Sequence, residues 1–474
     1  MTSTALDEQV PVAAVPRRSR GLGAVLAAVG IPTFMVTLDN LVVTNALPVI
    51  KTEMNASLTD LQWFVNAYTL SFAALLLTAA ALGDRLGRRR LFVAGIALFT
   101  LASAACALVT EPWMLIAARA IQGIGGAAVM PLSLTLLAGA VPDRQRSAAI
   151  GIWGGISGLG VAVGPVVGGA VVEGLNWQWI FWLNVPIGVV AVVLASRVLG
   201  ESRGIKQRLD LLGLLLASAG VLSIVWGVVN GADDGWTSAG VLTSLIAGVG
   251  LLAAFLGWER RTAAPMLPLR LYRVRSFSVV NVVWFTFSLG VFGAVFLLSQ
   301  FFQVVQGYSP LESGIRTMPW TMAPMVIAPI AGLIVDRVGP RVLVATGQVL
   351  LVIGLSWMAL TVTADVTFGQ LLVPFILAGI GMGLTFAPLA SVVMGEMPDA
   401  DRGVASGTNN TIREIGVAMG VAVLASVFAS AGSYETPDRY VDGLVPAVWV
   451  GAAAVAVGAV LALLLPGRRK AVGA

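Results

Sequence analysis

About fourteen long apolar stretches, joined by short loops, take up nearly all of this chain of 474 residues. A helix needs about 20 apolar residues to cross a bilayer. Charged residues make up 11% of the sequence, whereas about a quarter of a soluble domain is charged. The sequence therefore predicts an all-α integral membrane protein with fourteen transmembrane helices and no sizeable soluble domain.

The charges predict how these helices lie in the membrane. The predicted spans are 22–47, 61–82, 91–110, 113–138, 147–171, 178–197, 210–230, 239–258, 277–304, 314–335, 341–361, 368–394, 403–430 and 444–465. With the N-terminus in the cytoplasm, 24 of the 29 Lys and Arg residues fall in cytoplasmic segments and 3 in outer loops (Lys51, Arg316 and Arg439). Positive residues favour the cytoplasmic side. We therefore expect the cell membrane as location and both termini in the cytoplasm.

Several kinds of chemistry are excluded by composition. The chain has no histidine and a single cysteine, Cys106, so we expect no histidine-ligated metal and no internal disulfide. Its lysines, at 51, 206 and 470, follow no glycine-rich phosphate loop, so ATP hydrolysis is not expected. The net charge of +5 is explained by the positive loops, without nucleic acid. We predict that the protein is not an enzyme, has no cofactor and draws on an ion gradient or a partner.

The chain repeats itself. Residues 83–89 (GDRLGRR) follow the second span, and residues 335–341 (VDRVGPR) follow the tenth, 252 positions later. Residues 142–146 (PDRQR) match 398–402 (PDADR) 256 positions later. This predicts two six-helix halves in the same sense, with two helices inserted between them, a transporter architecture. The expected units are a tail (1–20, without a signal peptide), an N-terminal half (21–198), an inserted pair with linkers (199–275), a C-terminal half (276–466) and a tail (467–474).

One carboxylate, Asp39, lies inside the first apolar stretch. A charge at membrane depth costs about 2.5–3.5 kcal/mol, so such a residue usually meets a cavity, a proton or a counter-charge. Arg119 lies at a similar depth in the fourth span, and Gln122 shares its helix face. Asp39 and Arg119 could form an ion pair or alternate with a proton. The alternative is a static structural pair.

Two further charges, Arg413 and Glu414, lie near the middle of the thirteenth span. Neighbouring helix positions point about 100° apart, so we expect that they do not pair face to face and that at least one meets a cavity. The alternative is a role in one interhelical hydrogen bond. Asn410 lies about one turn away and would extend a polar strip. Aromatic residues of several spans, such as Trp284 and Trp320, could line an apolar cavity.

The two repeated loops are candidate gates. Glycine permits a tight turn, and Asp84 and the neighbouring arginines can pair with each other or with helix ends of the facing half. Such pairs would hold the cytoplasmic face closed. A loop that only sets orientation is the alternative, and the presence of two copies favours the gate. The predicted gate residues are Asp84, Arg85, Gly87, Arg88, Asp336, Arg337 and Arg341.

The fifth span is rich in glycine and contains a proline. Glycines three and four positions apart let another backbone approach closely, and proline allows a bend. We interpret this span as a hinge or sliding contact between the halves, with tight static packing as the alternative. The candidate residues are Gly160, Gly164, Pro165, Gly168 and Gly169.

Four segments carry a resemblance to a known family. Residues 80–89 resemble the signature loop of the major facilitator superfamily, with Ala80 where its first glycine usually stands. Residues 119–123 resemble its span-4 motif tied to proton coupling, and residues 160–169 its span-5 motif of exporters. Residues 38–48 are similar to the span-1 motif of the fourteen-helix drug:proton antiporter branch, but read LVVTN at 41–45 where TIVNV is usual. The resemblance covers about residues 20–466.

The resemblance implies proton-coupled export by alternating access. Asp39 would be the proton- or cation-binding carboxylate, and Arg119 would modulate its protonation. The expected partners are protons, membrane lipid and amphipathic or cationic small molecules such as antibiotics and dyes, with the protein as a monomer. A proton symporter that imports a nutrient is the first alternative, disfavoured by the span-5 pattern. A non-transporting scaffold or sensor is the second, disfavoured by the paired loops and the charges within the spans.

Overall fold

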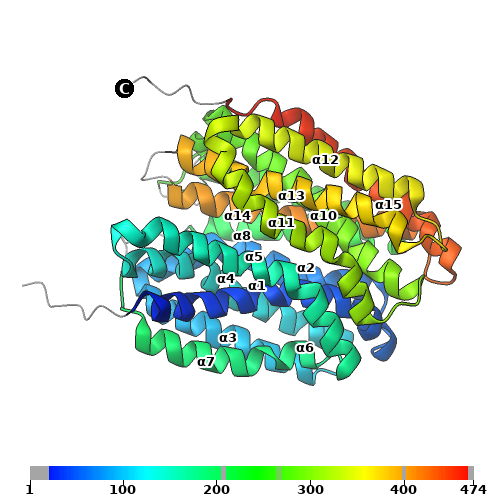
Figure 1. Ribbon diagram of the computed structural model, residues 1–474, viewed down its shortest axis with the longest axis horizontal. Helices are drawn as coiled ribbons and strands as arrows, with labels where there is room; N and C mark the ends of the chain where they lie inside the picture. Colours follow the sequence, from blue (N-terminus) through cyan, green and yellow to red (C-terminus); the bar gives the residue numbers. More distant parts are fainter. Residues whose placement is uncertain are drawn as a thin grey trace, which may run out of the picture.

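The computed structural model describes residues 21–203, 210–263, 265, 267, 269–397 and 402–467, which form helices joined by short loops (Figure 1). The helices are α1 (Leu22–Glu53), α2 (Leu58–Leu86), α3 (Arg88–Leu108), α4 (Pro112–Ala140), α5 (Asp143–Gly174), α6 (Trp179–Trp182), α7 (Asn184–Val198), α8 (Leu211–Asp234), α9 (Ala239–Glu259), the 3₁₀ helix η1 (Leu269–Arg273), α10 (Arg275–Val304), α11 (Pro310–Val338), α12 (Pro340–Thr361), α13 (Phe368–Glu396), α14 (Arg402–Ala431) and α15 (Pro437–Ala462).

The predicted fold class is confirmed. Twelve helices are long and apolar enough to cross a membrane, and two bent helix pairs raise the number to 14 if each pair is one span. Helices are favoured because a backbone in hydrocarbon must bond its own polar groups. Ser57, Ser309 and Thr367 begin α2, α11 and α13 with capping boxes, which satisfy the first backbone N–H groups of each helix.

Helix packing follows the predicted halves. In the first half α1 lies against α5 and α7, and α4 against α2 and α3. In the second half α10 lies against α14 and α15, and α13 against α11 and α12. The halves meet along two seams, α5 with α11 and α2 with α14. The exact unit boundaries stay a prediction.

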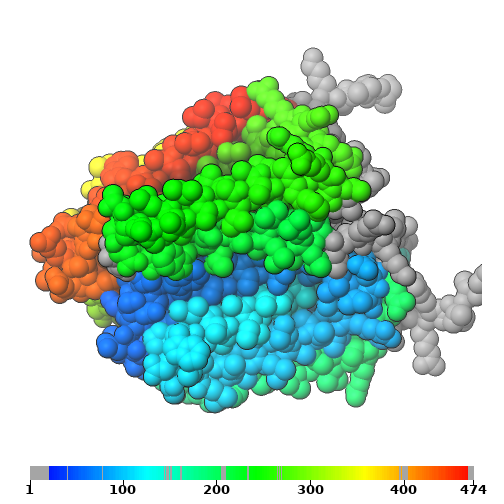
Figure 2. Space-filling view, turned by 180° about the vertical axis from the view of Figure 1, so that it is seen from behind, coloured from blue at the N-terminus to red at the C-terminus, as the bar shows by residue number. Residues whose placement is uncertain are grey.

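The inserted helices α8 and α9 pack on each other, and α8 also contacts α2 and α14. Figure 2 shows this pair (green) between the blue and cyan first half and the orange and red second half. The pair therefore covers the outside of the seam between α2 and α14.

The two ends of the bundle can be told apart by the chain. The start of α1 and the end of α15 lie at the same end, on the left in Figure 1, which we call the terminal end. The opposite end is the far end. The loops 87, 141–142 and 339 lie at the terminal end, and the loops 54–57 and 305–309 lie at the far end, because successive spans alternate in direction.

Two spans are bent. The parts of α2 on either side of residue 77 make an angle of 52°, and the parts Ile152–Gly160 and Val163–Gly174 of α5 make an angle of 41°. The break in α5 comes one turn before Pro165. Proline cannot bond the carbonyl four residues earlier and its ring presses on it, so Pro165 accounts for this bend. The predicted bend in the fifth span is thus observed.

Close helix contacts in this fold depend on particular glycines, and Gly125 of α4 tests this. A Cβ at Gly125 would lie 2.6 Å from the Phe99 backbone nitrogen of α3. We expect Gly125→Ala to lower the free energy of unfolding by about 1–3 kcal/mol, because the backbones must separate. The control is Gly139→Ala in the same helix, where a Cβ meets nothing within 4 Å. Thermal unfolding in detergent compares them, and equal midpoints would contradict this packing.

Candidate functional site

A buried ion pair joins α1 to α4. The Arg119 Nη1 donates to the Asp39 Oδ2 at 2.5 Å, and each side chain is 1% exposed. Hydrogen bonds between charged groups are shorter and stronger than neutral ones. Of the two relations predicted for these residues, this conformation has the ion pair.

Two amide side chains complete the bonding of the carboxylate. The Asp39 Oδ1 accepts hydrogen bonds from Gln122 Nε2 at 2.9 Å and from Asn184 Nδ2 at 2.8 Å. Gln122 Oε1 accepts from Arg119 Nη1 at 2.6 Å, and Asn184 Nδ2 also donates to Ser103 Oγ at 3.0 Å. The predicted residue Gln122 therefore belongs to this site. We call these five residues the Asp39 cluster.

The guanidinium of Arg119 has further contacts on α2. Its Nε donates to the Phe64 carbonyl at 3.1 Å, and its Cζ lies 4.3 Å from the centre of the Tyr68 ring, a distance at which an aromatic face attracts a cation. Its Nη2 is buried without a hydrogen-bond partner among the described residues. The cluster and the contacts of Arg119 thus join α1, α2, α3, α4 and α7, all in the first half, and the two charged side chains are buried there.

The expectation that Arg413 and Glu414 do not pair was wrong. The Arg413 Nη2 donates to the Glu414 Oε1 at 2.5 Å, and the arginine side chain is 26% exposed whereas the glutamate is 8% exposed. The prediction considered only the directions in which neighbouring Cβ atoms point. The long arginine side chain can fold back around the helix, and its Cζ lies 5.9 Å from the Trp284 ring centre.

The polar strip next to this pair is only partly formed. Asn410, the predicted member, donates to the Ser406 carbonyl of its own helix. Its neighbour Asn409 donates to Asn281 Oδ1 of α10 at 3.2 Å. Thr411 donates to the Ala73 carbonyl of α2 at 3.4 Å. This part of α14 therefore contacts the first half directly.

The first signature loop contains the ion pair of Asp84 with Arg88, whose atoms Oδ1 and Nε lie 2.6 Å apart. Gly87 has φ +118°, a left-handed conformation that favours glycine, so the predicted tight turn is present. Arg85 is exposed. The backbone N–H groups of Arg89 and Arg90 donate to the Glu201 carboxylate, which sequence reasoning missed.

The second signature loop repeats the turn, since Gly339 has φ +94°. Asp336 and Arg337 are exposed, and Arg341 Nε donates to the Leu465 carbonyl at 2.7 Å. In the described ranges no ion pair joins either loop to the opposite half. The gating role of both loops stays a prediction.

Three glycines of the span-5 motif pack on α1 rather than on the other half. A Cβ at Gly164 would lie 2.8 Å from the Leu41 Cβ, and a Cβ at Gly168 would lie 2.9 Å from the Val42 carbonyl oxygen. A Cβ at Gly160 would overlap the side chain of Thr37. These glycines hold α5 and α1 together within the first half.

The seam between α5 and α11 is closed at one end only. A Cβ at Gly169 would overlap the Pro310 carbonyl, and a Cβ at Gly314 would overlap the Pro165 carbonyl. Nearer the terminal end of α5, a Cβ at Gly154, Gly155 or Gly158 would meet nothing within 4 Å. The backbones therefore touch at the far end and separate toward the terminal end.

Side chains also cross between the halves at the far end. The Asn45 Nδ2 donates to the Pro165 and Pro310 carbonyls, each at 2.9 Å. Gln303 Nε2 donates to the Asn45 carbonyl at 2.8 Å, and Ser313 Oγ donates to the Asn45 Oδ1 at 3.3 Å. One amide side chain thus connects α1 with α5 of its own half and α11 of the other.

Two charged groups reinforce this closure. The Glu173 carboxylate of α5 accepts a hydrogen bond at 3.1 Å from the backbone N–H of Leu311, in the first turn of α11, where a negative charge is favoured. Lys51 Nζ lies 3.1 Å from the centre of the Tyr434 ring, whose hydroxyl donates to Gln300 Oε1 at 2.6 Å. Burial raises the pKa of Tyr434, so its hydroxyl keeps its proton.

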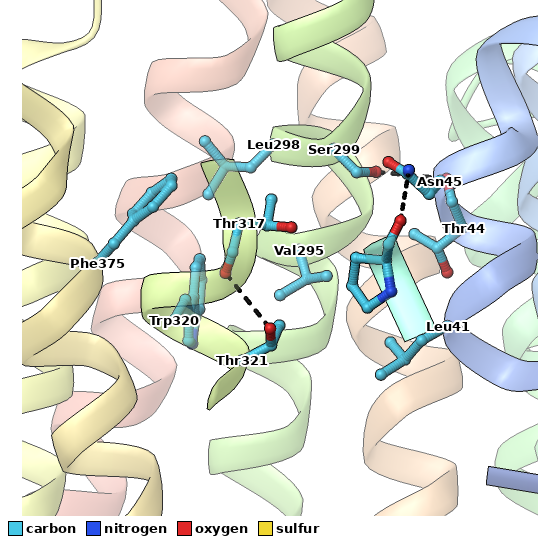
Figure 3. Close-up of a pocket in the computed structure, with 11 residues that line it drawn as sticks. Leu41, Thr44, Asn45, Val295, Leu298, Ser299, Thr317, Trp320, Thr321 and Phe375 are labelled. Carbon is cyan, nitrogen blue, oxygen red and sulfur yellow. Dashed lines mark hydrogen bonds between the residues drawn. The ribbon is translucent and has the colours of Figure 1, made fainter. Parts of the chain in front are cut away.

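A small pocket lies beside Asn45, between the halves. Figure 3 shows Asn45 and Ser299 on one side and Trp320 and Phe375 on the other. Its volume is about 20 Å³, room for about one water molecule. Its lining residues are uncharged: Leu41, Thr44, Asn45, Pro165, Val295, Leu298, Ser299, Thr317, Trp320, Thr321 and Phe375. These residues come from α1 and α5 of the first half and from α10, α11 and α13 of the second.

Sequence reasoning missed two amides, Asn184 and Asn45. Asn184 is a polar residue in an otherwise apolar segment, 184–195, and that isolation was a usable signal. Asn45 lies within the segment where the span-1 motif departs from its usual form. The departure was visible, but its contacts across the seam were not.

The comparisons with known proteins decide the family. The sequence profile of the Major Facilitator Superfamily matches residues 29–421 and 321–473. The chain belongs to the major facilitator superfamily. It is a multi-pass membrane transporter rather than an enzyme, and the predicted resemblance is confirmed.

Several similar curated proteins are named for drug or antibiotic resistance, export or efflux. The chain is 34% identical to the tetracenomycin C resistance and export protein of Streptomyces glaucescens, over 89% of this chain and 79% of that protein. It is 36% identical to the multidrug resistance protein Stp of Mycobacterium tuberculosis, over 89% and 78%. It is 34% identical to the multidrug efflux pump LfrA of Mycolicibacterium smegmatis, over 92% and 86%.

Solved structures share the fold. A D-xylose–proton symporter has a TM-score of 0.67 and 13% identity, over 94% of this chain and 99% of that one. The peptide transporter PepTSo has a TM-score of 0.67 and 14% identity, over 94% and 98%.

The buried ion pair predicts a double-mutant result. Arg119→Leu leaves the Asp39 carboxylate buried without its counter-charge, which typically costs about 3–5 kcal/mol. Adding Asp39→Asn removes that charge, so we expect the double variant to be more stable than Arg119→Leu alone. Unfolding in detergent measures the free energies. Additive effects of the two substitutions would show that the residues do not interact.

Proposed function

We propose that this transporter exports amphipathic or cationic small molecules, such as antibiotics and dyes, in exchange for protons by alternating access. The observation that carries the proposal is the Asp39 cluster, a carboxylate buried within a membrane span and bonded to a single arginine. The relatives named for drug or antibiotic resistance, export or efflux support the substrate class. Membrane lipid and a monomeric state remain parts of the proposal.

Asp39 is the proposed proton site. A proton on its carboxylate removes the negative charge and leaves the Arg119 guanidinium without a counter-charge in a buried site. An uncompensated buried charge is strongly unfavourable. Protonation of Asp39 therefore favours a movement of α1 relative to α4.

The proposed cycle runs between two conformations. With the far end open, Asp39 takes a proton from outside and the substrate leaves. The halves then move, the terminal end opens, and substrate from the cytoplasm or inner leaflet replaces the proton. The excess of Lys and Arg in the terminal-end loops supports a cytoplasmic terminal end. One proton moving down 100 mV supplies about 2.3 kcal/mol.

A proton symporter that imports a nutrient is the second candidate. The fold does not separate the two, because a sugar–proton symporter has it too. The direction of flux decides between them. A non-transporting scaffold is the remaining alternative, and substrate-dependent proton flux would exclude it.

The first test is Asp39→Asn. In proteoliposomes with an internal pH dye and an imposed pH gradient, we expect a panel of cationic and neutral drugs to collapse the gradient with the native protein and not with Asp39→Asn. The neutral amide keeps the shape but takes no proton. The control is Asp365→Asn, in an exposed loop. Full coupled flux in folded Asp39→Asn would remove Asp39 from the mechanism.

The second test concerns the proposed gate. We propose that the signature loops close the terminal end when the far end is open, with Asp84 orienting Arg88. We expect Asp84→Ala to lower drug flux at least about tenfold, since 1.4 kcal/mol lost from one conformation changes its population by that factor. Glu111→Ala, at an exposed far-end carboxylate, should leave flux unchanged. Unchanged flux in Asp84→Ala would argue against the gate.

A further inference from the structure

The Asn45 side chain bonds to both halves of the transporter at once. It is 2% exposed. Its Nδ2 reaches the Pro165 carbonyl in its own half and the Pro310 carbonyl in the other, and its Oδ1 accepts from Ser313 Oγ and from Gln303 Nε2, at 3.2 Å. The donors and the acceptor of this amide are therefore all used, and three of the four partners lie in the second half.

Opening the far end would break the three bonds that join Asn45 to the second half. Proline carbonyls and a buried amide without partners are costly to leave unsatisfied. As the halves part, water must replace the lost hydrogen-bond partners. The bonds therefore favour the closed far end, in addition to the backbone contact of Gly169 with Pro310.

Asn45 lies at the part of the α5–α11 seam where the two halves are in contact. The contact is tight there, whereas a Cβ at Gly158, nearer the terminal end of α5, would meet nothing within 4 Å. Asn45 also lines the small pocket between the halves. The usual form of the span-1 motif has valine at this position, so the bonds of Asn45 do not follow from the family pattern.

We propose that Asn45 is the latch of the far-end gate: its side-chain hydrogen bonds to the second half hold the far end closed in this conformation and must break before the far end can open. Asn45 is thus a positioning residue that sets the balance between the two conformations. The proposal rests on alternating access in the proposed function, but its test needs no transported molecule.

The experiment measures the access of a reagent from each face. The one native cysteine, Cys106, is replaced by alanine, and a single reporter cysteine is introduced. Thr317→Cys, 8% exposed and lining the pocket, reports opening of the far end. Gly158→Cys, at a site with open space, reports opening of the terminal end. A membrane-impermeant maleimide is added to right-side-out or inside-out vesicles.

With Asn45 present, we expect slow labelling of Thr317→Cys from the far face and fast labelling of Gly158→Cys from the terminal face. Asn45→Leu should speed the first at least about tenfold, because several buried hydrogen bonds are lost, and should slow the second. Asn45→Ala removes the same bonds without bulk and gives the same test if the leucine variant does not fold.

The matched control is Asn281→Leu. Asn281 is also 2% exposed, and its amide bonds to Phe277 and Asn409 within the second half alone. Its substitution should leave both labelling rates unchanged.

Unchanged rates in folded Asn45→Leu, or faster labelling at both reporters, would overturn the latch, since general loosening opens both faces. Opposite shifts at the two reporters would establish it. Opposite shifts in a protein that exports no drug would overturn the proposed function and leave the latch standing.

Discussion

The paired charge of Asp39 and Arg119 is the constraint on which the rest of the first half depends. Hydrocarbon does not tolerate an unpaired carboxylate, so α1 and α4 must keep the register that places these side chains 2.5 Å apart. Gln122 and Asn184 supply further donors, which brings α7 to the same point. A single charge thus fixes the relative positions of three helices before any packing of apolar side chains is considered.

Glycine decides how closely the helices can approach this cluster and each other. Gly164 and Gly168 let α5 lie directly on α1, and Gly169 and Gly314 let α5 touch α11. The first contacts are made within one half and hold it as a unit. The contacts of Gly169 and Gly314 are made between the halves and occur only at the far end. The glycines of α5 therefore hold the first half together, and they leave the α5–α11 seam free to open at the terminal end.

The fold was predictable because it follows from properties that every span shares, namely length, hydropathy and the charges of the loops. The Asp39 site was predictable in part, since a charge in an apolar span requires a partner and Arg119 lay at a matching depth. Asn184 was missed because an amide in a span has many possible partners. The pairing of Arg413 with Glu414 was missed because side-chain flexibility is not contained in helix geometry. The bonds of Asn45 depend on the α5–α11 crossing, which no single segment specifies.

Helix α1 carries both Asp39 and Asn45, six residues apart, which corresponds to about 9 Å along its axis. Pro32 lies before this interval, and Pro48 removes only the backbone hydrogen bond to the Thr44 carbonyl at its end. The backbone hydrogen bonds made between residues 39 and 45 therefore still join the two positions. A helix segment of this length behaves as a stiff rod. An axial slide or rotation of α1 at Asp39 therefore also moves Asn45. The charge state of Asp39 inside the first half is thus mechanically connected to the contact that Asn45 makes with the second half.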